Sequence, residues 1–214
     1  MKRLLICLCS VFLFQMAFAL TTPLKISVIP PVALFNSSAN VIGADIGLIL
    51  TRSRSVIGAQ AGLVCEAEYS YICQYAVCYA KAKNAYGFQY ALGYVKIEKG
   101  YGLVMTMVSN VGTYTGIQFG EVGYADKTVG VQISGIYGCT KELRGVLYTG
   151  FYAKTDKLYG ISFGCVNITR EAYGVQLGLY NYAETLKGVQ IGLINVVRKN
   201  GVLPVMIGIN AGFK

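Results

Sequence analysis

One short motif recurs through most of this chain and limits how it can fold. Beginning at Gly43, eleven copies of a glycine-rich segment follow one another through residues 43–197, each starting 14 or 15 residues after the last. Three of the copies read GVQISGIYG, GVQLGLYNY and GVQIGLINV. Self-similarity with so short a period means that one small structural unit repeats and that neighbouring units bury one another. The repeats therefore predict one repetitive domain.

Residue types alternate within each copy. The second and fourth positions hold mainly bulky apolar residues, whereas the first is nearly always Gly, the third is most often Gln and the fifth is always small. A period of two is that of a β-strand with one apolar face and one small, polar face. The chain is therefore predicted to be all-β.

The charged residues indicate how such strands would be joined. Most of them lie between the copies, in short polar links such as 52–55 and 154–157, and links of this length suit an antiparallel meander. The Gly and Gln face carries almost no Lys or Glu, unlike the exposed face of a soluble sheet. A strand of about ten residues tilted by about 40° rises roughly 25 Å, the height of the apolar band of an outer-membrane barrel.

We therefore expect an antiparallel meander that closes into a transmembrane β-barrel of about 12 strands, with apolar side chains toward lipid and Gln, Gly and Asn toward the lumen. The alternative is a β-solenoid, in which each repeat of 14–15 residues forms one coil and Gln and Asn side chains stack in ladders. The pattern Gln-x-Gly-x-x-Asn, at residues 176–181 and again at 190–195, supports this alternative.

Two strands are expected to flank the repeats, at residues 24–35 and 202–213. Pro30 and Pro31 lie in the first and Pro204 in the second, so both lose backbone donors for sheet pairing. In a barrel these two strands would be neighbours at the seam, whereas in a solenoid they would protect the two open edges.

The third position of the repeat supplies the candidate site residues. In a barrel these side chains would face the lumen, and an acidic one would tune the ion selectivity of a pore. They are Asp45, Gln60, Gln74, Gln89, Gln118, Gln132, Gln176 and Gln190. Glu121 differs, because its position places it on the apolar face, toward lipid, where a charge is out of character.

The composition argues against an enzyme and against bound cofactors. The chain has no His, which removes His-based acid–base catalysis and any mixed Cys/His metal site. Each repeat glycine lies within a strand and no helix follows it, so a phosphate-binding loop is not expected. Five cysteines follow the leader, and their spacing fits no zinc or iron–sulfur pattern; we expect small apolar filler, with a disulfide between neighbouring strands as the alternative. They are Cys65, Cys73, Cys78, Cys139 and Cys165.

The N-terminus predicts export. Residues 1–19 have two basic residues, an apolar run and an A-x-A site ending at Ala19, as in a signal peptide, which leaves residues 20–214 as a single β-repeat domain. The chain is 54% hydrophobic, but the apolar residues come in short pieces. Its net charge of +9 suits a lipid headgroup region. The basic residues occur singly and are not interleaved with aromatics, so no nucleic-acid partner is expected.

The SVIPPVALF segment, the repeated GVQIGLxN units and the final segment beginning Leu203-Pro204 together resemble bacterial surface-repeat proteins of the spirochaete type. The resemblance is strongest over residues 160–213 and implies a location in the outer membrane or at the cell surface. It implies no catalytic residues. The expected function is that of a passive pore or structural surface component with membrane lipid as its partner; the alternative is a secreted solenoid serving as adhesin or as fibre or assembly subunit, whose host or surface ligand the sequence does not identify.

Overall fold

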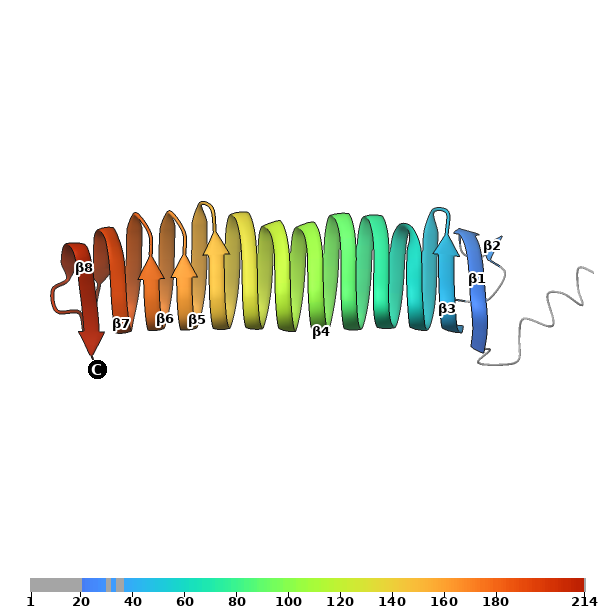
Figure 1. Cartoon of the computed structure of the whole chain (residues 1–214), viewed down its shortest axis with the longest axis horizontal. Helices are drawn as coiled ribbons and strands as arrows, with labels where there is room; N and C mark the ends of the chain where they lie inside the picture. Colours follow the sequence, from blue (N-terminus) through green and yellow to red (C-terminus); the bar gives the residue numbers. More distant parts are fainter. Residues whose placement is uncertain (1–20, 30–31, 34–36, 214) are drawn as a thin grey trace, which may run out of the picture.

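The repeats wind into a long rod of β-structure, a β-solenoid, in which each copy makes one turn (Figure 1). The computed structural model describes residues 21–29, 32–33 and 37–213. The predicted signal peptide lies outside the described residues. The described part of the chain contains no helix long and apolar enough to cross a bilayer.

Eight strands form one sheet in the order β2-β1-β3-β4-β5-β6-β7-β8. The longest strand, β4, is a spiral of 100 residues that includes most of the turns, and shorter strands continue it at both ends. The strands are β1 (Thr21–Ile29), β2 (Val32–Ala33), β3 (Asn40–Gly47), β4 (Leu50–Thr149), β5 (Tyr152–Phe163), β6 (Val166–Leu177), β7 (Tyr180–Val197) and β8 (Val205–Phe213).

Neighbouring turns pair in parallel, and this corrects the prediction of an antiparallel barrel. Gly145 pairs with Gly160, Gly160 with Gly174, and Gly174 with Gly188, so each residue lies beside its counterpart one repeat away. In an antiparallel meander, successive strands would run in opposite directions and most counterparts could not meet. The polar segments that we expected to be turns between strands instead form the opposite side of each coil. There the backbone remains extended and hydrogen-bonded to the neighbouring turns.

The flanking strands also differ from their expected place at a barrel seam. β1 pairs in parallel with β3 at one end of the rod, and β8 pairs antiparallel with β7 at the other (Figure 1). The short strand β2 pairs antiparallel with β1. At the other end the Val202 N–H donates to the Ala211 carbonyl of β8 at 2.8 Å. Both ends of the spiral are thus partly covered by reversed chain, as an exposed sheet edge requires.

Glycine at the first position of the repeat allows the turns to stack closely. Gly160 has φ +135°, a conformation that side chains disfavour, and a Cβ there would lie 2.0 Å from the Gly145 carbonyl oxygen. Ile72 is the one described non-glycine residue with positive φ, at +84°, and it occupies the same position of the repeat. The repeat glycine therefore serves the backbone at a point of close approach.

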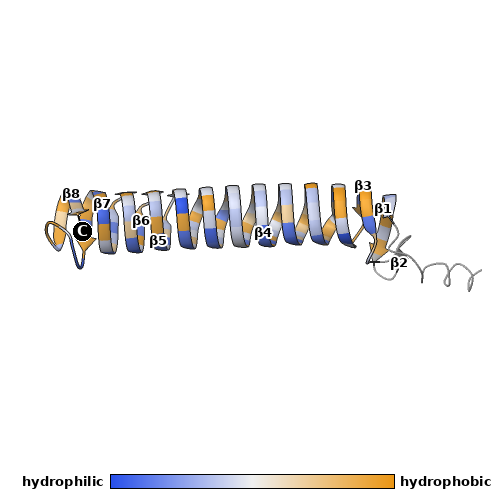
Figure 2. Ribbon diagram, turned by 90° about the horizontal axis from the view of Figure 1, so that it is seen from below, coloured by the Kyte–Doolittle hydropathy of each residue, from blue (hydrophilic) through white to orange (hydrophobic). Residues whose placement is uncertain are grey.

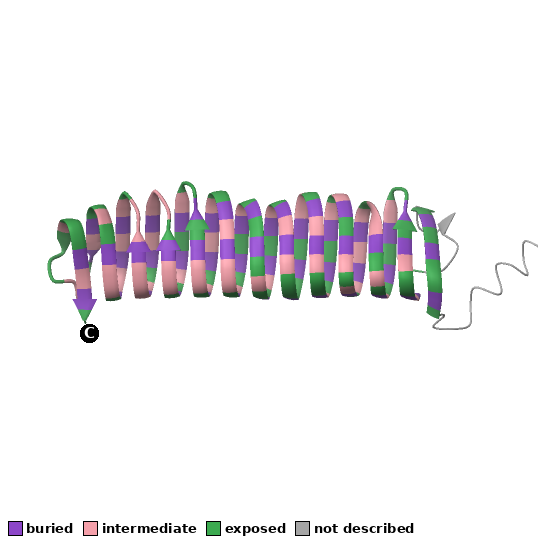
Figure 3. Ribbon diagram, viewed as in Figure 1, coloured by how far each residue is buried: buried purple, intermediate pink, exposed green. Residues whose placement is uncertain are grey.

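The inside of the coil is filled by side chains from every turn. Buried and exposed residues recur at the same level of successive turns, so they form rows that run along the rod (Figure 3). Apolar clusters fill the interior around Val95 and Val104 and again around Leu143 and Leu158, and polar side chains fill much of the remainder. Within the described residues the strands enclose their own side chains, so the interior is filled and no open lumen is formed.

Candidate functional site

The third position of the repeat points into the solenoid. The eight residues predicted to face a barrel lumen are all buried, with exposed fractions of 0–1%. The two predicted faces are present, but the polar face lines a packed interior. These eight side chains are Asp45, Gln60, Gln74, Gln89, Gln118, Gln132, Gln176 and Gln190. They stabilise the rod from within and have no access to a solute.

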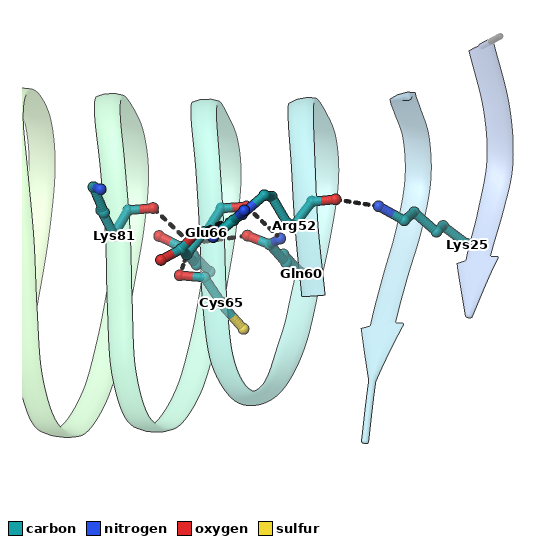
Figure 4. A network of polar contacts seen from close by, with 7 residues as sticks. Lys25, Arg52, Gln60, Cys65, Glu66 and Lys81 are labelled. Carbon is teal, nitrogen blue, oxygen red and sulfur yellow. Dashed lines mark hydrogen bonds and ion pairs between the residues drawn. The ribbon is translucent and has the colours of Figure 1, made fainter. Parts of the chain in front are cut away.

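A charged network begins this polar row at the N-terminal end. The buried Asp45 carboxylate accepts hydrogen bonds from Thr51 Oγ1 at 2.5 Å, Ser53 Oγ at 2.6 Å and Gln60 Nε2 at 3.1 Å. Lys25 reaches in from β1, and its Nζ donates to Ser53 Oγ at 2.9 Å. It also donates to the Arg52 carbonyl, as Figure 4 shows. A buried carboxylate is tolerated only when hydrogen-bond donors surround it, and Thr51, Ser53 and Gln60 provide these donors to Asp45.

Burial shifts the acid–base properties of this region. It lowers the pKa of Lys25, and the negative charge of Asp45 opposes part of that shift. Burial, helped by Asp45, raises the pKa of the Cys65 thiol to about 12. A thiol with so high a pKa holds almost no thiolate at neutral pH and is a poor nucleophile. The network is a structural end-piece of the polar row.

Amide side chains form ladders along the interior, with opposite directions in two rows. In the Gln row, Gln74 Nε2 donates to Gln60 Oε1 at 2.8 Å, toward the N-terminal end. In a row near the C-terminal end, Asn167 donates to Asn181 at 2.8 Å and Asn181 to Asn195 at 2.9 Å. The recurring Gln-x-Gly-x-x-Asn pattern supported the solenoid alternative, and its Asn residues form this second ladder in the structure.

The outside of the coil carries a continuous apolar surface. Positions two, four and six of each turn face outward and are almost all apolar; we call these three rows the apolar face. Apolar residues recur along the whole length of the rod (Figure 2). Ile46, Phe119 and Tyr148 in the fourth row are 47–52% exposed, and in the sixth row Leu193 is 63% exposed. Ordinary soluble surfaces do not repeat such side chains in every turn.

The size of the apolar face is unusual for a chain that folds alone. Eleven turns spaced by about 4.8 Å, with five strand residues of about 3.3 Å across, give roughly 800 Å². The largest apolar patch of a typical monomer is about 300–600 Å². The apolar face is therefore larger than the usual apolar patch of a monomer.

Two rows of tyrosines border the apolar face. On one side, Tyr71, Tyr86 and Tyr101 stack with ring centroids 5.0 and 5.4 Å apart. On the other side, Tyr79 stacks on Tyr94 at 5.6 Å and, further along, Tyr137 on Tyr152 at 5.4 Å. Tyrosine has an apolar ring and a polar tip, so these rows separate the apolar face from the charged side of the rod.

Glu121 is the one charged residue in the three rows of the apolar face. It is exposed, lies in the sixth row, and belongs to the sixth of the eleven turns. Its outward position is the one that the alternation predicted, although the surface is that of a solenoid. Its side chain lies over Gly135, where a Cβ would come within 2.1 Å of the carboxylate.

The opposite side of the rod carries the charges, and they pair between turns. Glu66 pairs with Arg52 of the preceding turn at 2.6 Å, and Lys141 pairs with Asp126 at 2.7 Å. Such exposed pairs contribute little to stability one by one. The paired residues lie 14 or 15 positions apart, which is the length of one turn in the parallel register. Opposite charges at this spacing are visible in the sequence and indicate a solenoid, although the barrel prediction did not take them into account.

The cysteines and acidic residues form no further site. All five described cysteines are free thiols, so the alternative of an interstrand disulfide is not realised. Cys78 is exposed beside the apolar face, and Cys65 is buried. Among the described residues, no group of three or more Cys, Asp or Glu side chains could hold a metal ion.

The fold and this surface define a class, that of amphipathic β-solenoids with an apolar and a charged side. Compared with known family models, curated proteins and solved structures, the chain matches none of them.

Proposed function

We propose that this protein is an exported, surface-associated solenoid that acts as a scaffold or adhesin-type module through contact along its side. The apolar face carries this proposal, because it extends over all eleven turns and has the size of a recognition surface. The signal-peptide pattern of residues 1–19 and the resemblance to surface-repeat proteins support export.

The covered ends of the rod favour an adhesin-type module over a fibre subunit. A fibre that grows end to end needs a free strand edge at each end. Here the Val202 N–H occupies the Ala211 carbonyl on β8, and Asn210 Oδ1 accepts from the Ala211 N–H at 2.9 Å. At the other end, β2 pairs with the outer strand β1. The long side is the larger free surface.

The location can be tested on intact cells that express the protein. A membrane-impermeant, lysine-directed biotin reagent should label the exposed Lys81, Lys83 and Lys154 before the cells are lysed. A cytoplasmic protein serves as the control and should remain unlabelled until lysis. Labelling only after lysis, with recovery of the protein in the cytoplasmic fraction, would contradict the proposal.

The contact function can be tested with beads that carry the purified protein. Beads coated with the wild type should adhere to an apolar or lipid-coated surface more than beads coated with a variant that has Lys at Leu92 and Leu193 on the apolar face. Asn110→Lys adds a positive charge at an exposed position on the charged side and serves as the matched control. Equal adhesion of all three coatings would show that the apolar face makes no contact.

A further inference from the structure

On the basis of the proposed function, we propose that the apolar face is a docking surface for a lipid bilayer, on which the rod lies flat with its charged side in water. The geometry is that of a monotopic protein, which inserts one apolar surface into the interfacial region of one leaflet. This binding requires no pore and no membrane-crossing strand.

The tyrosine rows are the first argument for lipid. The centre of the apolar face is mostly aliphatic, Phe and Met, with tyrosine at three of the eleven fourth-row positions. Tyrosines are more frequent at its edges, with Tyr86 and Tyr101 along one and Tyr94 and Tyr152 along the other. Tyrosine concentrates where hydrocarbon meets headgroups, because its ring prefers the first and its hydroxyl the second. A rod lying on its apolar face would hold both rows at that depth.

Charge is the second argument. Removal of the predicted signal peptide, with Lys2 and Arg3, lowers the net charge from +9 to +7, and two cations lie in the first tyrosine row itself. Arg144 lies over the ring of Tyr159 at 5.4 Å, and Lys187 over that of Tyr173 at 5.6 Å. Basic groups at the border of an inserted surface attract the phosphates of anionic lipids, and each contributes modestly.

Glu121 distinguishes lipid from a second copy of the chain as the occupant. It belongs to the middle turn, so a full-length, twofold pairing of two apolar faces would bring both Glu121 carboxylates to the same level of a dry interface. No Lys or Arg occupies the second, fourth or sixth row to neutralise them. Like charges brought together in an apolar interface oppose association. In a bilayer, the single Glu121 meets no second carboxylate and can reach toward the headgroup region.

The test uses the absence of tryptophan from the chain. Leu193→Trp places one reporter on the apolar face, and Asn110→Trp places one on the charged side. With phosphatidylcholine vesicles containing phosphatidylglycerol, Trp at position 193 should shift its emission to the blue and be quenched by lipids with a spin label in the acyl chain. Trp at position 110 should do neither. The same response from both reporters, or from neither, would overturn the proposal.

Flotation with the same vesicles measures affinity. Leu92→Lys and Leu193→Lys should each reduce partitioning about tenfold, since each removes one exposed leucine that the bilayer would bury, whereas Asn110→Lys should not reduce it. Glu121→Gln should raise partitioning. Stable dimers in light scattering without lipid, lost in Leu193→Lys and accompanied by no flotation of the wild type, would assign the face to a second copy and overturn the proposal. Surface labelling of cells is independent of this result, so the proposed function can hold where lipid docking fails.

Discussion

The C-terminal turns, residues 160–197, and the central turns, residues 72–122, have the same backbone but differently filled interiors. In the C-terminal turns the Asn ladder is continuous, and it ends where Asn195 donates to the Gly208 carbonyl of β8 at 2.9 Å. In the central turns the corresponding row holds Ala80, Val95 and Ser109, and small apolar residues fill the space.

The difference shows that an amide ladder depends on its neighbours. Each Gln of a continuous ladder accepts from the next turn, but Val104 replaces Gln in the middle of the row and can donate nothing. In the described structure Gln89 Oε1 therefore has no hydrogen-bond partner. The Oε1 atoms of Gln74 and Gln118 have none either, because the next amide in the row donates elsewhere: Gln89 to Ser70 Oγ and Gln132 to the Gly123 carbonyl. Gln190 Oε1, the last of the row, also has no partner. Continuous polar rows therefore fix the register of the turns, whereas apolar filling supplies burial with less directional preference.

The largest expected effect comes from the glycine row, which both regions share. Gly174→Ala should lower the free energy of unfolding by about 3–5 kcal/mol, since its Cβ would lie 2.0 Å from the Gly160 carbonyl oxygen at φ +136°. Gly208→Ala is the control, because its φ is +84° but no atom lies within 4 Å of the added Cβ. Urea denaturation compares the two, and equal losses would show that stacking distance is unimportant.

A second substitution tests the Asn ladder directly. Asn181→Ala removes donors to the Ile191 carbonyl and to Asn195, and it should cost about 3 kcal/mol. Ser109→Ala changes the same row in the central turns and should cost about 1–2 kcal/mol, because it removes the long bond that Ser109 donates to the Val122 carbonyl at 3.4 Å and the hydroxyl that accepts from the Gln118 amide. Similar costs in thermal unfolding would contradict the distinction between the two regions.

Ile72→Gly should stabilise the central turns by about 1 kcal/mol. The substitution restores glycine to a position with φ +84° and relieves the cost of a side chain in that conformation. Ile72→Ala keeps the strain and serves as the control. A loss of stability in Ile72→Gly, measured by urea denaturation, would contradict this prediction. It would mean that the contacts of the isoleucine side chain stabilise the fold by more than its positive φ destabilises it.

The smallest effect is expected from repairing the Gln row. Val104→Gln should add up to about 1 kcal/mol, since the new amide can donate to Gln89 Oε1, which has no partner in the described structure. Val104→Leu adds volume without an amide and should not stabilise. If thermal unfolding shows the same loss of stability for both variants, the interior of the central turns cannot accommodate a larger side chain, and the missing amide does not limit their stability.

The local structure was predictable from the residues themselves. The alternation predicted β-structure and placed Gln60 and Gln176 on one face and Phe119 and Ile191 on the other, and the structure has them so. The direction of the neighbouring strands was not predictable in the same way. A period of two and a repeat of 14 or 15 residues fit a hairpin with a short turn as well as one coil of a solenoid.

The sequence by itself determined the all-β repeat and its two faces, because both depend on neighbouring residues in the chain. Only the tertiary structure decided that Gly145 lies beside Gly160 and that Asn167 lies beside Asn181, since these contacts join residues a full turn apart. That parallel stacking turned the polar face into the interior and the apolar face into the outside of the rod. The same alternation that predicted a lipid-facing barrel wall thus produced an exposed apolar side on a filled solenoid.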